Sequence, residues 1–147
     1  MSAEERDAEV SEAPRQETLV LVVDDERDIR ALISMRLEQA GYKVDTAVDG
    51  KQGLQMTTDL EPDLVVLDVH MPGETDGYEL TRQIRAQAGT TADTPVLLLS
   101  ATADENDIDV GLVAGANDYL MKPFKAAELR SRVRILLGAK AQKEVPE

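Results

Sequence analysis

The sequence contains no cysteine, no tryptophan and only one histidine. The absence of cysteine excludes disulfide bonds, thiolate zinc sites and cysteine nucleophiles, and one histidine excludes a multi-histidine metal site. With one Phe and three Tyr, the core must be built from aliphatic side chains. No apolar run approaches the length of a membrane-spanning helix, and the acidic first residues are unlike a signal peptide. We therefore expect a soluble, cytoplasmic protein without a membrane partner.

Basic residues are also scarce, with 16 Lys and Arg against 29 Asp and Glu and a net charge of −13. In the absence of a basic patch, this charge repels nucleic acid, and we expect no nucleic-acid partner. The length of 147 residues and the hydrophobic content of 42% suit a single globular domain.

The chain divides into three parts. Residues 1–17 carry six acids against two arginines and lack apolar periodicity, which predicts a disordered acidic extension. The folded domain is expected over 18–138, because Gly138 and the polar residues after it should stop the last helix. Residues 139–147 then form a flexible tail. They are too few for an output module, so a stand-alone domain is expected, although the same residues could equally be the start of a linker.

Five short apolar runs alternate with five helical patterns along the folded part. The expected strands are 18–23, 42–47, 64–69, 95–99 and 118–121, and the expected helices are 28–40, 50–59, 77–87, 104–114 and 126–137. This alternation predicts the α/β class, with a doubly wound parallel sheet. Periodicity does not give the strand order, but the flavodoxin-like order 2-1-3-4-5 is one of the two common choices.

Charged residues follow several of these runs. Asp24 and Asp25 close the first run, Asp68 closes the third, and Lys122 follows the last. The carboxyl ends of parallel strands share one edge of the sheet, where ligands bind. Three carboxylates repel one another unless a cation relieves them, and oxygen ligands suit Mg²⁺. Asp68 is then either a metal ligand or a nucleophile that accepts a phosphoryl group.

Two other residues follow strands at the same edge. The hydroxyl of Ser100 is placed to bond a phosphoryl oxygen or, equally, to cap its strand. Lys122 would oppose developing negative charge. The proline after it predicts a cis Lys122–Pro123 peptide, since X-Pro bonds adopt the cis form in tight turns.

The blocks LVVDDE, LVVLDVHMPG, VLLLSA and GANDYLMKPF together resemble the receiver domain of two-component response regulators, over about 18–138. The resemblance implies a phosphorylation-activated switch rather than an enzyme with an external substrate. The roles that it implies are phosphoacceptor for Asp68, direct Mg²⁺ ligand for Asp25, water-mediated ligand for Asp24, backbone-carbonyl ligand for His70, phosphate-binding lysine for Lys122, switch hydroxyl for Ser100 and switch aromatic for Tyr119.

The same resemblance implies the partners. A sensor histidine kinase or a histidine phosphotransfer protein would supply the phosphoryl group. A downstream protein would bind the face formed by 104–114, 118–121 and 126–137, and the phosphorylated protein could dimerise. Side chains two positions beyond the phosphoacceptor and the switch hydroxyl tune hydrolysis in receivers. Here they are His70 and Thr102, neither of which positions water well, so a long-lived phosphoryl state is expected.

One segment departs from the family pattern. Met71–Gly77 is one residue longer than the usual loop, which puts the shape of the loop beside Asp68 in question. Two other functions share the architecture. A Mg²⁺-dependent phosphatase with an aspartyl nucleophile would need a general acid where His70 stands. A flavodoxin-like cofactor binder would need aromatic residues for stacking, and these are few.

Overall fold

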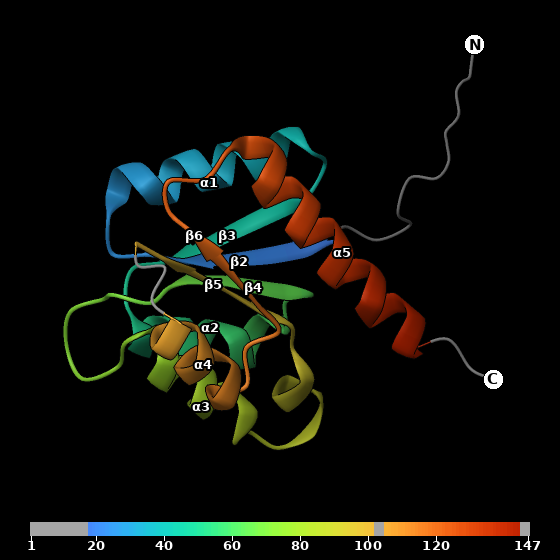
Figure 1. Ribbon diagram of the computed structural model, residues 1–147. Coiled ribbons are helices and arrows are strands. Elements are labelled where there is room, and N and C mark those ends of the chain that lie inside the picture. Colours follow the sequence, from blue (N-terminus) through green and yellow to red (C-terminus); the bar gives the residue numbers. More distant parts are fainter. Residues whose placement is uncertain (1–17, 102–104, 145–147) are drawn as a thin grey trace, which may run out of the picture.

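The computed structural model describes residues 18–101 and 105–144, with side chains described as far as residue 139. Figure 1 shows the chain with its helices and strands labelled. The predicted acidic extension, Thr102 and the start of the helix expected at 104 lie outside the described residues.

Five parallel strands form a single sheet in the order β3-β2-β4-β5-β6. Counted along the chain, this is the order 2-1-3-4-5, so the predicted doubly wound, flavodoxin-like fold is confirmed. The strands are β2 (Leu19–Val23), β3 (Lys43–Ala47), β4 (Leu64–Asp68), β5 (Val96–Ser100) and β6 (Asp118–Met121).

Helices cover both faces of the sheet (Figure 1). α1 and α5 lie on one face, and α2, α3 and α4 lie on the other. The helices are α1 (Arg27–Gln39), α2 (Gly50–Leu60), α3 (Gly77–Arg85), α4 (Glu105–Ala114) and α5 (Ala126–Glu144). A short 3₁₀ helix, η1 (Gly89–Asp93), lies between α3 and β5.

Strand β2 shows how the sequence builds two cores. Val20 and Val22 pack toward α1 and α5, whereas Leu21 and Val23 pack toward α2 and α3. Successive side chains point to opposite faces of a strand, so a strand covered on both faces is apolar throughout. Both cores are almost entirely aliphatic, as the composition requires.

Aspartate caps start two of the helices. The Asp49 side chain accepts a hydrogen bond from the Gln52 N–H at α2, and Asp76 accepts one from Glu79 at α3. Such caps satisfy N–H groups that lack partners within the helix. Asp76 also fixes where α3 begins, immediately after the loop that follows Asp68.

Helix α5 is longer than predicted. It continues through Glu144, so the prediction that Gly138 stops it is wrong. A glycine inside a helix costs only about 1 kcal/mol relative to alanine, and the residues that follow Gly138 are mostly good helix formers.

Candidate functional site

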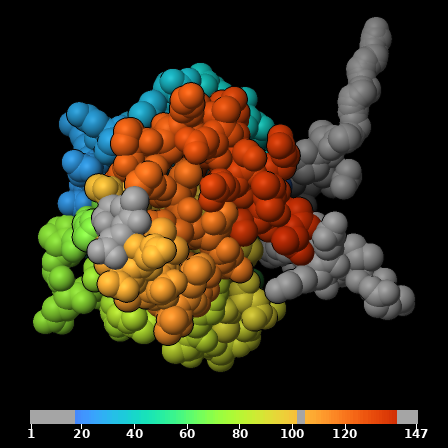
Figure 2. Space-filling view, viewed as in Figure 1, coloured from blue at the N-terminus to red at the C-terminus, as the bar shows by residue number. Residues whose placement is uncertain are grey.

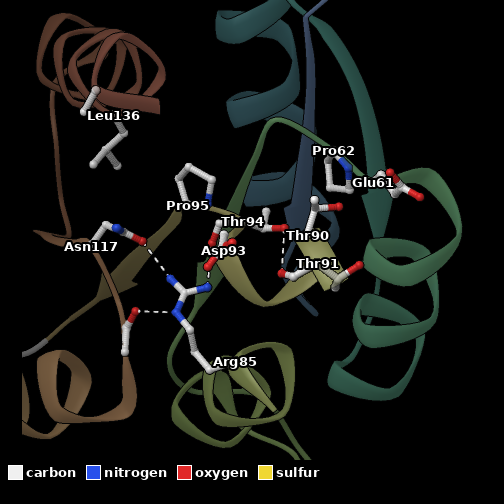
Figure 3. Close-up of a pocket in the computed structure, with 12 residues that line it drawn as sticks. Glu61, Pro62, Arg85, Thr90, Thr91, Asp93, Thr94, Pro95, Asn117 and Leu136 are labelled. Carbon is white, nitrogen blue, oxygen red and sulfur yellow. Dashed lines mark hydrogen bonds between the residues drawn. The ribbon is translucent and has the colours of Figure 1, made fainter. Parts of the chain in front are cut away.

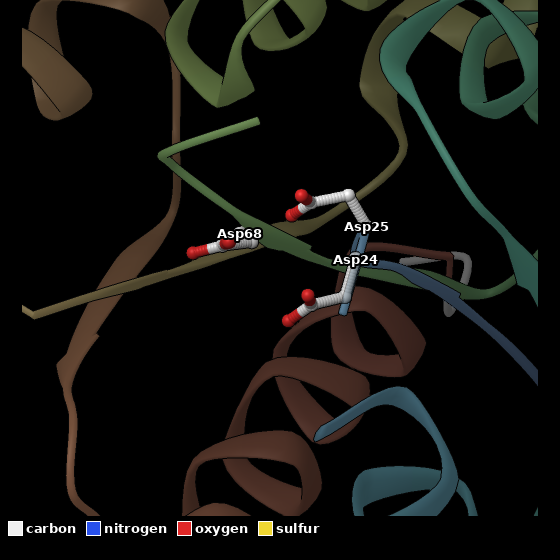
Figure 4. A group of neighbouring side chains, drawn as sticks. All are labelled: Asp24, Asp25 and Asp68. Carbon is white, nitrogen blue, oxygen red and sulfur yellow. The ribbon is translucent and has the colours of Figure 1, made fainter. Parts of the chain in front are cut away.

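Three carboxylates meet at the carboxyl edge of the sheet. Asp24 and Asp25 directly follow β2, and Asp68 is the last residue of the neighbouring strand β4. One carboxylate oxygen of each lies within 4.8 Å of the others. Figure 4 shows all three side chains directed to the same side. The spatial prediction made from the strand ends is confirmed.

Lys122 brings a positive charge into this group from the end of β6. Its Nζ atom lies 3.2 Å from Asp68 Oδ1 and 3.6 Å from Asp24 Oδ2. The contact with Asp68 is short enough for a hydrogen bond. The contact with Asp24 is an ion pair whose distance is too long for a hydrogen bond. The peptide between Lys122 and Pro123 is cis, as predicted.

Asp24 is the most buried of the three acids, with a side chain only 1% exposed. Its Oδ1 atom accepts the Glu26 N–H at 2.8 Å, but its Oδ2 atom has no hydrogen-bond donor among the described residues. Burial raises the pKa of Asp24, and the charges of Asp68 and Asp25 add to the rise, while the Glu26 N–H and Lys122 oppose it. A buried carboxylate oxygen without a donor fits a cation ligand.

These features make a prediction for stability. At pH 7 and without divalent cations, Asp24→Asn should raise the melting temperature by a few degrees. The change removes a buried negative charge yet keeps an acceptor for Glu26. Because the folded-state pKa is raised, the wild-type carboxyl becomes neutral as the pH falls through that pKa, and the advantage of the variant should shrink there.

Thermal unfolding followed by circular dichroism between pH 4 and pH 8 measures this effect. The control is Asp25→Asn at the exposed neighbouring position, which should change the melting temperature little. A lower melting temperature for Asp24→Asn at pH 7 would contradict the argument from burial.

The other predicted site residues lie in β5 and β6 and directly after β4. Ser100 ends β5 and is fully buried, and its carbonyl accepts the Lys122 N–H at 2.6 Å. Tyr119 lies in β6, half-buried against the cluster formed with α3. His70 follows β4 with an exposed side chain. The structure therefore places Ser100 beside Lys122, and Tyr119 on the face of the sheet that α3 and α4 cover.

The long loop after Asp68 packs against the start of α2. At Gly50 a Cβ atom would meet the side chain and the carbonyl oxygen of Thr75, so only glycine fits there. Gly73 takes a left-handed conformation with φ of 92°. The extra residue is thus accommodated by a glycine turn and by close contact with α2, and the sheet beside it is undisturbed.

Sequence reasoning missed a second polar centre, around Arg85. Its guanidinium donates to the carbonyls of Gly115, Ala92 and Thr94 and to the Asn117 side chain, at 2.7–3.1 Å. Figure 3 shows Arg85 with Thr94 and Asn117 among the residues that line a cavity of about 690 Å³. The cavity lies where β4, β5 and β6 begin, at the edge opposite the carboxylates. Arg85 thus links the starts of the strands. The only sign of this role in the sequence is an arginine on a helix face that mixes apolar and polar residues.

Arg30 was also missed. It donates from α1 to the backbone carbonyl of Asp24 at 2.8 Å and so holds the end of β2. Nothing in the spacing of the helix distinguishes it from an exposed arginine. Within the described ranges, we find no helix with both the length and the apolar character needed to cross a bilayer.

The fold and the charged cluster are those of a parallel α/β domain with acids and a lysine at the carboxyl edge of its sheet. The sequence model of one protein family, the response regulator receiver domain, matches residues 20–134. This chain belongs to that family. It is 43% identical over 118 residues to the DNA-binding dual master transcriptional regulator RpaA of Synechocystis, covering 80% of this chain and 48% of that protein.

Solved structures of other response regulators and receiver domains resemble this one. The chemotaxis response regulator CheY4 of Vibrio cholerae has a TM-score of 0.76 and 32% identity, and the match covers 82% of this chain and 99% of that one. The receiver domain of a sensor histidine kinase from Pseudomonas aeruginosa has a TM-score of 0.77 and 35% identity, with 84% and 99% covered. That structure holds a magnesium ion in its active-site cleft.

The relatives overturn one prediction from composition. The expectation that excluded a nucleic-acid partner is wrong, because the Synechocystis relative is a DNA-binding regulator. The charge argument considered only the residues of this chain, and this chain spans about half the length of the curated relatives it matches.

Proposed function

We propose that this chain is a phosphorylation-activated switch in which Asp68 accepts a phosphoryl group. The observation that carries the proposal is the convergence of three carboxylates and Lys122 at one point, with Lys122 Nζ 3.2 Å from Asp68 Oδ1. The donor is a phosphohistidine of a sensor kinase or a phosphotransfer protein. A carboxylate oxygen of Asp68 forms the new O–P bond while the P–N bond breaks, and the histidine nitrogen leaves with the bonding electrons.

The surrounding residues each have a part in this transfer. Asp24, Asp25, Asp68 and the backbone carbonyl of His70 would hold Mg²⁺, which supplies positive charge to the transferring oxygens. Lys122 keeps a second positive charge at the same place. Asp24 and Asp68 are almost completely buried, which strengthens these electrostatic interactions.

The switch then follows from the polar groups beside Asp68. Ser100 turns its hydroxyl to a phosphoryl oxygen, Lys122 pairs with another, and Tyr119 turns toward the space that Ser100 leaves. These changes remodel the face formed by α4, β6 and α5, which adjoin on the surface in Figure 2. A partner that binds the two conformations with different affinity then shifts the population.

The direct test is phosphoryl uptake from a small-molecule donor such as acetyl phosphate, read as the gain of one phosphoryl group in the intact mass. Uptake should require Mg²⁺ and should saturate at one group per chain. Uptake that proceeds equally well in excess EDTA would overturn the assignment of the metal. No uptake under any condition would overturn the function itself.

We also expect the phosphoryl group to be long-lived. His70 has an exposed side chain, and it offers neither a carboxylate nor an amide to orient water beside the acyl phosphate. His70→Gln should therefore shorten the lifetime several-fold, as measured by the decay of the phosphorylated mass after removal of the donor. His70→Ala is the control, with little change expected. Fast loss in the wild type that His70→Ala slows would contradict the expectation.

A further inference from the structure

Helix α4 is attached to the domain by little apolar burial. Its buried residues among those described are Gly111 and Ala114. Val110, Leu112 and Val113 are 43%, 47% and 87% exposed. The hydrophobic gain scales with the apolar area removed from water, and these small buried residues remove little. Individual polar contacts therefore help to fix the position of α4.

One such contact comes from Tyr78 on the neighbouring helix α3. Its hydroxyl donates to the backbone carbonyl of Asp107, in the first turn of α4, at 3.1 Å. Both residues are half-buried, so the bond is partly shielded from water and its loss would leave a carbonyl less well satisfied.

The same hydroxyl also shares a hydrogen bond with the hydroxyl of Tyr119. Burial raises the pKa of Tyr78, and the hydrogen bond with Tyr119 raises it further, so Tyr78 keeps its proton. A tyrosine hydroxyl donates one proton and can accept another. The Tyr78 hydroxyl can therefore bond Tyr119 and the Asp107 carbonyl at the same time.

Glycine at position 111 allows α4 to lie close to this pair. A Cβ atom there would be 3.4 Å from a ring carbon of Tyr78, 3.4 Å from one of Tyr119, and 2.7 Å from a Leu98 side-chain carbon. The two rings and α4 thus pack closely against one another at Gly111.

We infer that Tyr78 is a positioning residue that couples the rotamer of Tyr119 to the position of α4. The conformer described here pairs the Asp68 carboxylate with Lys122, and the linkage stabilises this conformer. When Tyr119 turns away, Tyr78 loses one hydrogen-bond partner and α4 is held less firmly. The inference deepens the proposed function, on which its second test rests, by naming the group that transmits the switch to the helix.

The first test does not depend on phosphorylation. Amide hydrogen exchange by NMR should be about fivefold faster at 109–114 in Tyr78→Phe than in the wild type, the effect of one net hydrogen bond. The matched control is Tyr42→Phe, which removes another half-buried hydroxyl on the opposite face of the sheet. Unchanged exchange in α4, or equal acceleration in every helix, would overturn the anchoring role.

The second test is a titration with beryllofluoride, a mimic of the acyl phosphate, at fixed Mg²⁺. Tyr78→Phe should lower the midpoint about fivefold, because only the conformer described here loses the bond. Adding Tyr119→Phe should then have less than its separate effect, since the two hydroxyls act through each other. A midpoint that is unchanged or raised would overturn the coupling. A wild type that ignores beryllofluoride would instead refute the proposed function, while hydrogen exchange still decides the role of Tyr78.

Discussion

Asp68→Asn should reduce phosphoryl uptake to background. The amide keeps the shape of the carboxylate but lacks the anionic oxygen that forms the O–P bond. Because Asp68 is nearly buried and paired with Lys122, no other carboxylate should replace it at the same point. The measurement is the intact mass after incubation with acetyl phosphate and Mg²⁺.

The matched control is Asp59→Asn, at an exposed aspartate in α2. This variant should take up one phosphoryl group at the wild-type rate. Full uptake by Asp68→Asn would show that the phosphoacceptor is another residue. Similar circular dichroism spectra for both variants would show that loss of uptake does not reflect unfolding.

The largest expected effect on stability is at Gly77, the first residue of α3. A Cβ atom there would lie 2.5 Å from the carbonyl oxygen of Asp68 and 2.7 Å from the Cα atom of Val69. Both are backbone atoms at the end of a buried strand and cannot move aside as a flexible side chain can. Gly77→Ala should cost about 3 kcal/mol and lower the melting temperature by roughly 10 °C.

Gly138→Ala provides the opposite control. Nothing lies within 4 Å of the Cβ position at Gly138, inside α5. Alanine there should stabilise the protein by about 0.5–1 kcal/mol. Thermal unfolding of the two variants measures the same substitution, glycine to alanine, at two different sites. A Gly77→Ala protein as stable as the wild type would show that the loop after β4 relaxes freely.

Gly77 also links stability to the site. The loop after Asp68 leads into α3, and its two ends are joined because the Gly77 N–H donates to the Val69 carbonyl at 2.9 Å. A variant that displaces this turn would move the Asp68 backbone together with its carboxylate. We therefore expect any folded Gly77→Ala protein to be impaired in phosphoryl uptake as well.

Most of the fold could be predicted because the signals are local. Apolar runs such as Leu64–Leu67 can be buried on both faces only in a covered parallel sheet. Asp24, Asp25 and Asp68 could be placed together because parallel strands end at one edge. The end of α5 could not be predicted, since a single glycine weakens a helix without ending it.

The sequence by itself determined which charges meet, because strand direction and chain order bring Asp24, Asp68 and Lys122 to one edge. Only the tertiary structure decided the hydrogen-bond partners of individual polar groups. It leaves one Asp24 oxygen without a donor, places Arg85 across the starts of the strands, and places Tyr78 between Tyr119 and α4. The reason is that the periodicity of hydrophobic residues depends only on neighbours in the sequence. The hydrogen bond between Tyr78 and Asp107, 29 positions apart, depends instead on how α3 and α4 pack on the sheet.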